Sequence, residues 1–168
     1  MSRQIDAVID AADITERLVG ITTIYLQNSI SRGLYGLQAS VTSGQVREQR
    51  RRFSRDDVFG IALVWLLFEA GLRNELIARA LKEIAGTKRA NANLAANKLL
   101  DTKCEYLLIF RTPRGPSKSI PDKPTQLVQA TGQAEVGLEI EKHTGSDVVA
   151  IPIGHKFRDV TKRLEILF

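Results

Sequence analysis

Five arginines lie within nine positions in the first half of this 168-residue sequence: Arg47, Arg50, Arg51, Arg52 and Arg55. A guanidinium group is planar, permanently charged and rich in N–H donors, so it suits phosphate oxygens and narrow minor grooves. Residues 73–103 add seven basic and three acidic side chains, and the net charge of the chain is +5. Charge concentrated in this way indicates a polyanionic partner. A solvated, arginine-rich loop is the alternative interpretation.

Patterns of catalytic or metal-binding residues are missing from the sequence. There is no Ser-His-Asp order, no glycine-rich phosphate loop and no H-x-E…C-x-x-C pattern. Cys104 is the only cysteine, which excludes an internal disulfide framework, and it is expected to be a buried small hydrophobe. His143 and His155 have no ligand spacing relative to Cys104. We therefore expect no enzyme, no metal site and no other cofactor.

Two short helices are expected in the first 33 residues. Asp13 followed by Glu16 is a capping box, and Gly20 ends the helix that this pair starts. The hydroxyl of Thr22 or Thr23 can accept a free backbone N–H and so start a second helix. Two short helices joined by a glycine-containing turn form a helix-turn-helix candidate.

Residues 35–52 have no helical periodicity. Apolar residues alternate before Ser43-Gly44, which predicts a two-stranded hairpin that turns at this pair. Such a hairpin, directly after a helix-turn-helix, is a wing. Because alternate residues of a strand point to opposite faces, Arg50 and Arg52 would share one face and Arg51 would lie on the other.

A strongly apolar helix is expected to begin at Ser54. Asp57 lies three residues later and completes a capping arrangement. Residues 58–68 are apolar on nearly every side, so this helix must be buried all round, with Trp65 in the core.

Two further helices are expected after Gly71. The first starts near Asn74 and ends at Gly86. The second, over 87–101, is rich in Ala, Asn and Lys and has few apolar side chains, so it buries little alone. We interpret it as a connecting or dimerising helix.

With these elements in place, residues 13–85 resemble the MerR-type winged helix-turn-helix DNA-binding domain. Residues 21–34 fit the "V-S-x-x-x-L-R-x-x-x-x-x-G-L" pattern of the family's second helix. Residues 51–58 (RRFSRDDV) fit the "Y-R-x-[YF]-[ST]-x-x-D-[LV]" pattern where its third helix begins. Gly71-Leu72 stands at the position of the family's "L-G-L" ending.

The resemblance implies that the second helix lies in the major groove of DNA. Gln and Asn can pair with adenine there and Arg with guanine, and a Tyr hydroxyl can reach a phosphate. The wing arginines would meet the DNA backbone, although one could instead pair with Asp56 or Asp57. The expected DNA contacts are Thr22, Thr23, Tyr25, Gln27, Asn28, Arg32, Arg47, Arg50, Arg51 and Arg52.

The sequence also departs from the family pattern. The family carries Arg and a Tyr pair directly after the conserved Leu, where this chain has Gln27, Asn28 and Ser29. The stretch between Gly33-Leu34 and the Arg-Phe-Ser motif is longer by several residues. Metal-sensing branches of the family use several cysteines, so the single Cys104 argues against mercury or copper sensing.

The second half predicts a small α+β unit. Strands are expected at 105–112, near Leu127-Val128, at 136–142 by alternation, and at 148–153. A long proline-containing loop would occupy 113–124. The last residues fit either a helix or a strand. Because about 65 residues bury only a thin core, this unit is expected to pack on the helices or on a second subunit.

The expected fold is therefore α+β. It comprises a MerR-like winged helix-turn-helix domain over 1–86, a connecting or dimerisation helix over 87–103, and a small α+β dimerisation or effector domain with an antiparallel sheet over 104–168. We expect a cytoplasmic homodimer that binds double-stranded DNA as a sequence-specific transcription regulator, without membrane contact and with an unidentified effector. The alternatives are an architectural or phage or plasmid DNA-recognition protein (partition, packaging or recombination directionality), and a protein-interaction or ligand-sensing module that has lost DNA affinity.

Overall fold

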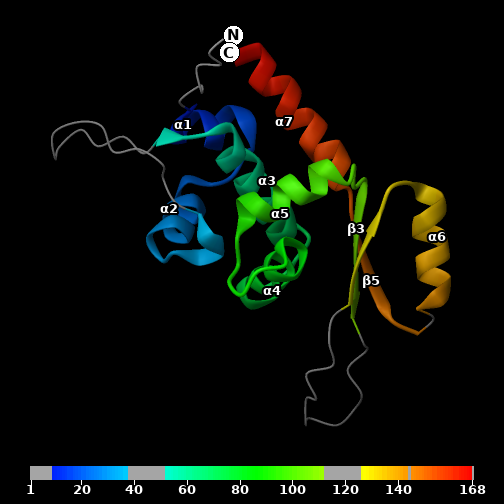
Figure 1. Cartoon of the computed structure of the whole chain (residues 1–168). Helices are drawn as coiled ribbons and strands as arrows, with labels where there is room; N and C mark the ends of the chain where they lie inside the picture. The colour runs from blue at the N-terminus through cyan, green and yellow to red at the C-terminus, as the bar shows by residue number, and fades with distance from the viewer. Residues whose placement is uncertain (1–8, 38–51, 112–125, 144, 168) are drawn as a thin grey trace, which may run out of the picture.

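The computed structural model describes residues 9–37, 52–111, 126–143 and 145–167, with only the backbone described at Arg52 and Arg111 (Figure 1). The fold is α+β. A group of helices surrounds the central helix α3, and a three-stranded antiparallel sheet lies beside this group. The expected hairpin turn at Ser43-Gly44 and the expected loop at 113–124 lie outside the described residues.

The first described segment pairs with the strand that precedes α3. Strand β1 (Ile9–Asp10) is antiparallel to β2 (Arg52–Phe53), so residues 52–53 return to the start of the helical region. Helix α1 (Ala11–Asp13) continues as a π-helical turn over Ile14–Leu18. The predicted capping box at Asp13 is wrong, because Asp10 already ends β1 in an extended conformation and the helix begins directly after it.

Helix α2 (Thr23–Ser31) follows a tight turn at Gly20, whose φ is +79°. The predicted start is confirmed, since the Thr22 hydroxyl oxygen accepts the N–H of Tyr25 at 3.4 Å. The helix ends where Gly33 adopts a left-handed conformation, and a 3₁₀ turn (Leu34–Gly36) comes next. Leu26 and Ser29 are buried and fix α2 on the core.

Helix α3 (Arg55–Glu69) is the centre of the molecule. Its predicted capping box is confirmed: the Ser54 hydroxyl accepts the N–H of Asp57, and the Ser54 N–H donates to the Asp57 carboxylate at 2.7 Å. Residues 57–64 of α3 are all buried, as predicted, whereas Phe68 near the end of the helix is 40% exposed. Trp65 differs from expectation, because it is only half-buried near the C-terminal end of the helix.

Helices α4 (Asn74–Ala85) and α5 (Ala92–Asp101) pack beside α3. The predicted helix at 87–101 is too long, because Gly86 ends α4 in a left-handed conformation and the Asn91 side chain caps α5 only from Ala92 onward. Small side chains let α5 approach α3 closely, and the amide of Asn93 donates to the Asp57 carboxylate at 2.6 Å. Helix α5 is thus part of the core of a single chain.

The sheet has β3 (Tyr106–Arg111) at its centre, flanked by β4 (Gln126–Ala130) and β5 (Asp147–Ile151). All three strands were expected. Leu107 and Ile109 on one face of β3 join the main core, whereas Leu108 and Phe110 on the other face pack near Val136 of α6 (Gln133–Lys142). The sheet therefore lies between α6 and the helical group (Figure 1).

The strand predicted at Val136–Lys142 is wrong, because this segment belongs to helix α6. Strands β4 and β5 are both antiparallel to β3 and hence parallel to each other, one on each side of it. Parallel strands need a crossover connection, and a helix is the usual one. The alternating apolar residues do not define a buried face, since Leu138 and Ile140 are 57% and 41% exposed.

Helix α7 (Ile153–Leu167) joins the sheet to the helical group, which settles the two possibilities for this segment in favour of a helix (Figure 1). The ring of Phe157 lies edge-on to Phe59 of α3, with centroids 5.4 Å apart. The Lys156 ammonium donates to the carbonyl of Val19 at 2.9 Å. One hydrophobic cluster therefore runs from Ile9 to Leu164, as expected for a C-terminal unit that packs on the helices. No helix in the described ranges is long and apolar enough to cross a membrane.

Candidate nucleic-acid interface

The exposed side of α2 carries most of the predicted contact residues. Thr22, Thr23, Gln27, Asn28 and Arg32 are all exposed. No acidic residue lies between Thr22 and Arg32. The structure thus gathers five of the ten expected contact residues on one helix and its two ends.

A helical residue advances by about 100° around the axis. Thr23 and Arg32 therefore lie at the two margins of the exposed arc of α2, and Gln27 and Asn28 lie between them. In the middle of the arc, between the two amides, is Ile24, which is 74% exposed. The exposed arc therefore presents polar side chains around one apolar side chain.

Tyr25, the sixth expected contact residue on α2, points away from this arc. Its ring packs against Phe68 and Trp65 of α3, with centroid distances of 4.5 Å and 5.4 Å. Its hydroxyl lies 3.4 Å from the hydroxyl of Tyr35. Tyr25 therefore packs α2 on α3. Its contact with a DNA phosphate stays a prediction.

Tyr35 anchors the turn that follows α2. Its hydroxyl donates to the Asn74 side-chain oxygen at the start of α4, at 2.9 Å, and its ring is buried. Burial, and then the hydrogen bond to Tyr25, raises the pKa of this hydroxyl above its usual range, so it remains a donor at physiological pH. The end of α2 is therefore tied to both α3 and α4.

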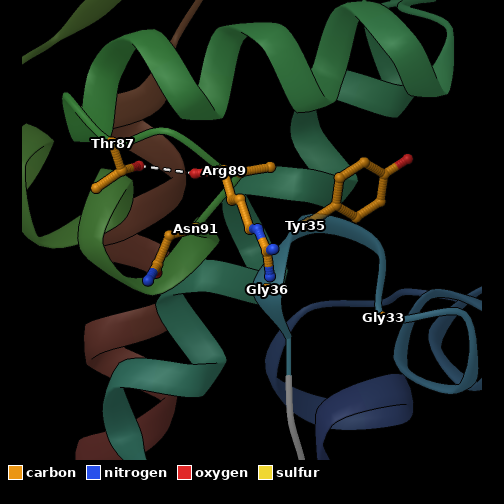
Figure 2. A pocket seen from close by; sticks show the side chains of 7 residues that line it. Gly33, Tyr35, Gly36, Thr87, Arg89 and Asn91 are labelled. Atoms are coloured by element: carbon orange, nitrogen blue, oxygen red, sulfur yellow. Dashed lines mark hydrogen bonds between the residues drawn. The ribbon is translucent and has the colours of Figure 1, made fainter.

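A notch of about 510 Å³ opens beside the C-terminal end of α2 (Figure 2). Gly33, Tyr35 and Gly36 form one wall, and the α4–α5 connection, Thr87–Asn91, forms the other. Figure 2 shows the side chain of Arg89 directed toward the Gly36 turn. The Thr87 hydroxyl donates to the Arg89 carbonyl at 2.7 Å and so shapes the loop. No acidic side chain of the described residues lines this notch.

The positive charge around α2 is not neutralised within the described residues. In that part of the chain, neither Arg32 nor Arg89 has a carboxylate within 4.0 Å, and the same holds for Arg55, Arg73 and Arg79. Arg17, Arg158 and Arg163 form ion pairs. Unpaired guanidinium groups keep their charge and donors available for a polyanion. Among the basic side chains of residues 73–103, Arg79 and Lys82 lie in α4 and Lys98 lies in α5. Lys88 and Arg89 lie in the connection between these two helices.

The expected wing arginines are not seen as a group. Arg52 is described by its backbone alone, which pairs with Asp10 in the β1–β2 ladder. Arg47, Arg50 and Arg51 lie outside the described residues. Their contact with the DNA backbone stays a prediction.

The residues weighed as metal ligands have other surroundings. Cys104 is buried, and burial raises the pKa of its thiol to about 11. His143 stacks on Phe110 with centroids 4.0 Å apart, and its ring nitrogens face the Glu139 carbonyl and the Gln126 side chain. In the described part of the chain, no three His, Cys, Asp or Glu residues lie close enough to hold a metal ion.

Two residues of this surface escaped the sequence analysis. The position of Ile24 between Gln27 and Asn28 on the helical wheel is the signal that places it on the exposed side. Arg89 belonged to the basic stretch at 73–103, but its approach to the end of α2 depends on the folding of α4 against α5.

Compared with known proteins, the chain matches no family model and no curated protein. Its function therefore has to be inferred from its residues and their arrangement.

Proposed function

We propose that this chain is a duplex-DNA-binding transcription regulator that inserts α2 into the major groove. The observation that carries the proposal is the exposed arc of α2, which presents Gln27 and Asn28 beside two threonines and no carboxylate. Amide side chains can form paired hydrogen bonds with adenine, and threonines can bond to any base edge. Arg32 at the end of the helix can reach guanine or a phosphate.

The arrangement of the flanking elements supports a winged helix-turn-helix domain. A short helical segment, a glycine turn and α2 follow one another, and the chain then returns to pair β2 with β1 before α3. In this proposal the segment between them, which carries Arg47, Arg50 and Arg51, is a wing that meets the DNA backbone. The same elements fit the MerR-type resemblance of residues 13–85.

Phosphate contacts at the end of α2 would fix the register of the helix on DNA. Arg32 directly precedes one wall of the notch and Arg89 belongs to the other, and neither has an ion-pair partner among the described residues. Contacts to phosphates position a protein, whereas contacts to base edges specify the sequence. We further propose that the chain acts as a homodimer on a two-fold symmetric site, because palindromic sites mirror protein symmetry.

The test is selection of a preferred duplex from a random library, followed by titration of fluorescently labelled DNA. Gln27→Ala and Asn28→Ala are each expected to weaken binding to the selected duplex by about 1–3 kcal/mol and to relax the preference at one base pair. Gln133→Ala, which removes an exposed amide from α6, is the matched control and should bind like the wild type.

Each outcome points to one function. A selected sequence that depends on the two α2 amides supports the regulator. Equal binding to all duplexes would replace it with an architectural role. No binding at low salt would replace it with a protein-interaction or ligand-sensing module.

A further inference from the structure

Ile24 is 74% exposed, and among the large apolar side chains of the described residues only Ile166 of α7 is more exposed. It is not at the edge of a core, because it lies in the middle of the exposed arc of α2, between Gln27 and Asn28. Residues three and four positions apart on a helix have Cβ atoms about 5–6 Å apart. The side chains of Ile24, Gln27 and Asn28 are therefore neighbours on the surface of α2. An apolar side chain in the middle of a polar surface gains free energy when an apolar partner removes it from water.

The major groove of DNA offers one such partner. A T·A pair presents the N6 donor and N7 acceptor of adenine together with the C5 methyl group of thymine. Neighbouring base pairs are separated by about 3.4 Å along each strand. An amide that binds adenine and an isoleucine three or four residues away can therefore reach the adenine and the thymine methyl of the same or the next base pair.

We infer that Ile24 determines specificity by packing on a thymine methyl group in the major groove, beside the adenine bound by Gln27 or Asn28. This inference rests on the proposed DNA-binding function and adds an A·T-containing step to its target. The interaction removes the methyl and the isoleucine side chain from water, which is favourable in proportion to the apolar area buried. It involves no hydrogen bond, so it discriminates thymine from uracil, which lacks only this methyl.

The experiment is a cycle that removes the two apolar partners one at a time. Each thymine of the selected duplex is replaced by deoxyuridine, which keeps the O4 acceptor and the pairing with adenine. Dissociation constants are measured by fluorescence anisotropy for the full chain, for Ile24→Ala and for Ile166→Ala. Ile166 is 82% exposed on α7, so Ile166→Ala matches the chemical change at a site outside α2. Thermal melting checks that both variants are folded.

The expected result is one thymine at which loss of the methyl weakens wild-type binding about fourfold, the effect of one buried methyl group. Ile166→Ala should show the same fourfold loss, and Ile24→Ala should show none at that position. The inference is overturned if deoxyuridine weakens binding of Ile24→Ala as much as binding of the wild type. It is also overturned if no thymine-to-deoxyuridine change weakens wild-type binding. In both cases the proposed DNA binding itself stands. If the wild type selects no duplex, the proposed function fails and this inference fails with it.

Discussion

Tyr35 holds the turn after α2 in a backbone conformation that few residues adopt. Its φ is +64°, in the left-handed region that favours glycine, and such a conformation costs about 1–3 kcal/mol for other residues. Contacts with the rest of the protein hold this conformation in place, because the Tyr35 ring is buried and its hydroxyl donates a hydrogen bond to Asn74. One residue thus fixes the C-terminal end of the candidate recognition helix.

Tyr35→Phe tests this anchor. The change leaves the Asn74 side-chain oxygen without its donor, so the free energy of unfolding should fall by about 1–2 kcal/mol in urea titrations. Tyr106→Phe is the matched control, because the Tyr106 hydroxyl makes no hydrogen bond among the described residues. Equal losses for the two variants would contradict the role given to the Tyr35 hydroxyl.

The roles of single residues were predictable where they depend on local sequence. The exposure of Thr22, Thr23, Gln27 and Asn28 follows from helical periodicity around the buried Leu26. The packing of Tyr25 did not follow, because Trp65 and Phe68 lie about forty positions further along the chain. Contacts between distant segments are set by tertiary structure, which periodicity does not encode.

At the scale of elements, α3 and α5 meet through a glycine. A Cβ atom on Gly60 would lie 2.2 Å from the Asn93 side-chain oxygen and 3.0 Å from the Asn93 backbone nitrogen. This spacing lets α5 lie directly on α3, where Ala92, Ala95 and Ala96 are buried. The capping box of α3 is then linked to α5 through Asn93.

Two glycine substitutions should therefore have opposite effects. Alanine favours a helix by about 1 kcal/mol over glycine, so Gly137→Ala in α6, where no described atom lies within 4 Å of the added methyl, should stabilise the chain by up to that amount. Gly60→Ala should destabilise it by about 1–3 kcal/mol because the added methyl overpacks the α3–α5 contact. Chemical unfolding measures both, and stabilisation by Gly60→Ala would disprove the close approach.

Helices and strands were predictable where the pattern of apolar residues in the sequence matched their burial in the fold. Helix α3 and strand β3 are buried on nearly all sides, so their apolar runs were sufficient. Helix α6 was missed because Val136, Leu138 and Ile140 alternate as in a strand, while the sheet topology demands a crossover helix at that place. The need for a crossover between β4 and β5 depends on the strand order of the whole sheet, which the local sequence pattern does not contain.

At the scale of the whole molecule, the two halves share one hydrophobic core. Phe157 and Val160 of α7 are buried in the same cluster as Ile9 and Ile14, and Lys156 bonds to Val19 at the turn before α2. The C-terminal unit therefore packs directly on the segment that precedes α2. The small size of this unit predicted that it packs on the helices or on a second subunit, but the choice between them and the path through α7 required the structure.

We propose that α2, Arg32 and Arg89 bind duplex DNA, and the salt dependence of binding tests this proposal most directly. Each phosphate that the protein neutralises adds about 0.9 to the slope of log affinity against log salt concentration. We expect tight binding by the wild type, and a shallower slope for Arg32→Gln/Arg89→Gln, by about 0.9 for each phosphate that this variant no longer neutralises. Lys162→Gln, which removes an exposed charge on α7, should keep the wild-type slope. A double variant with the wild-type slope and affinity, or a wild type that binds no duplex at low salt, would contradict the account.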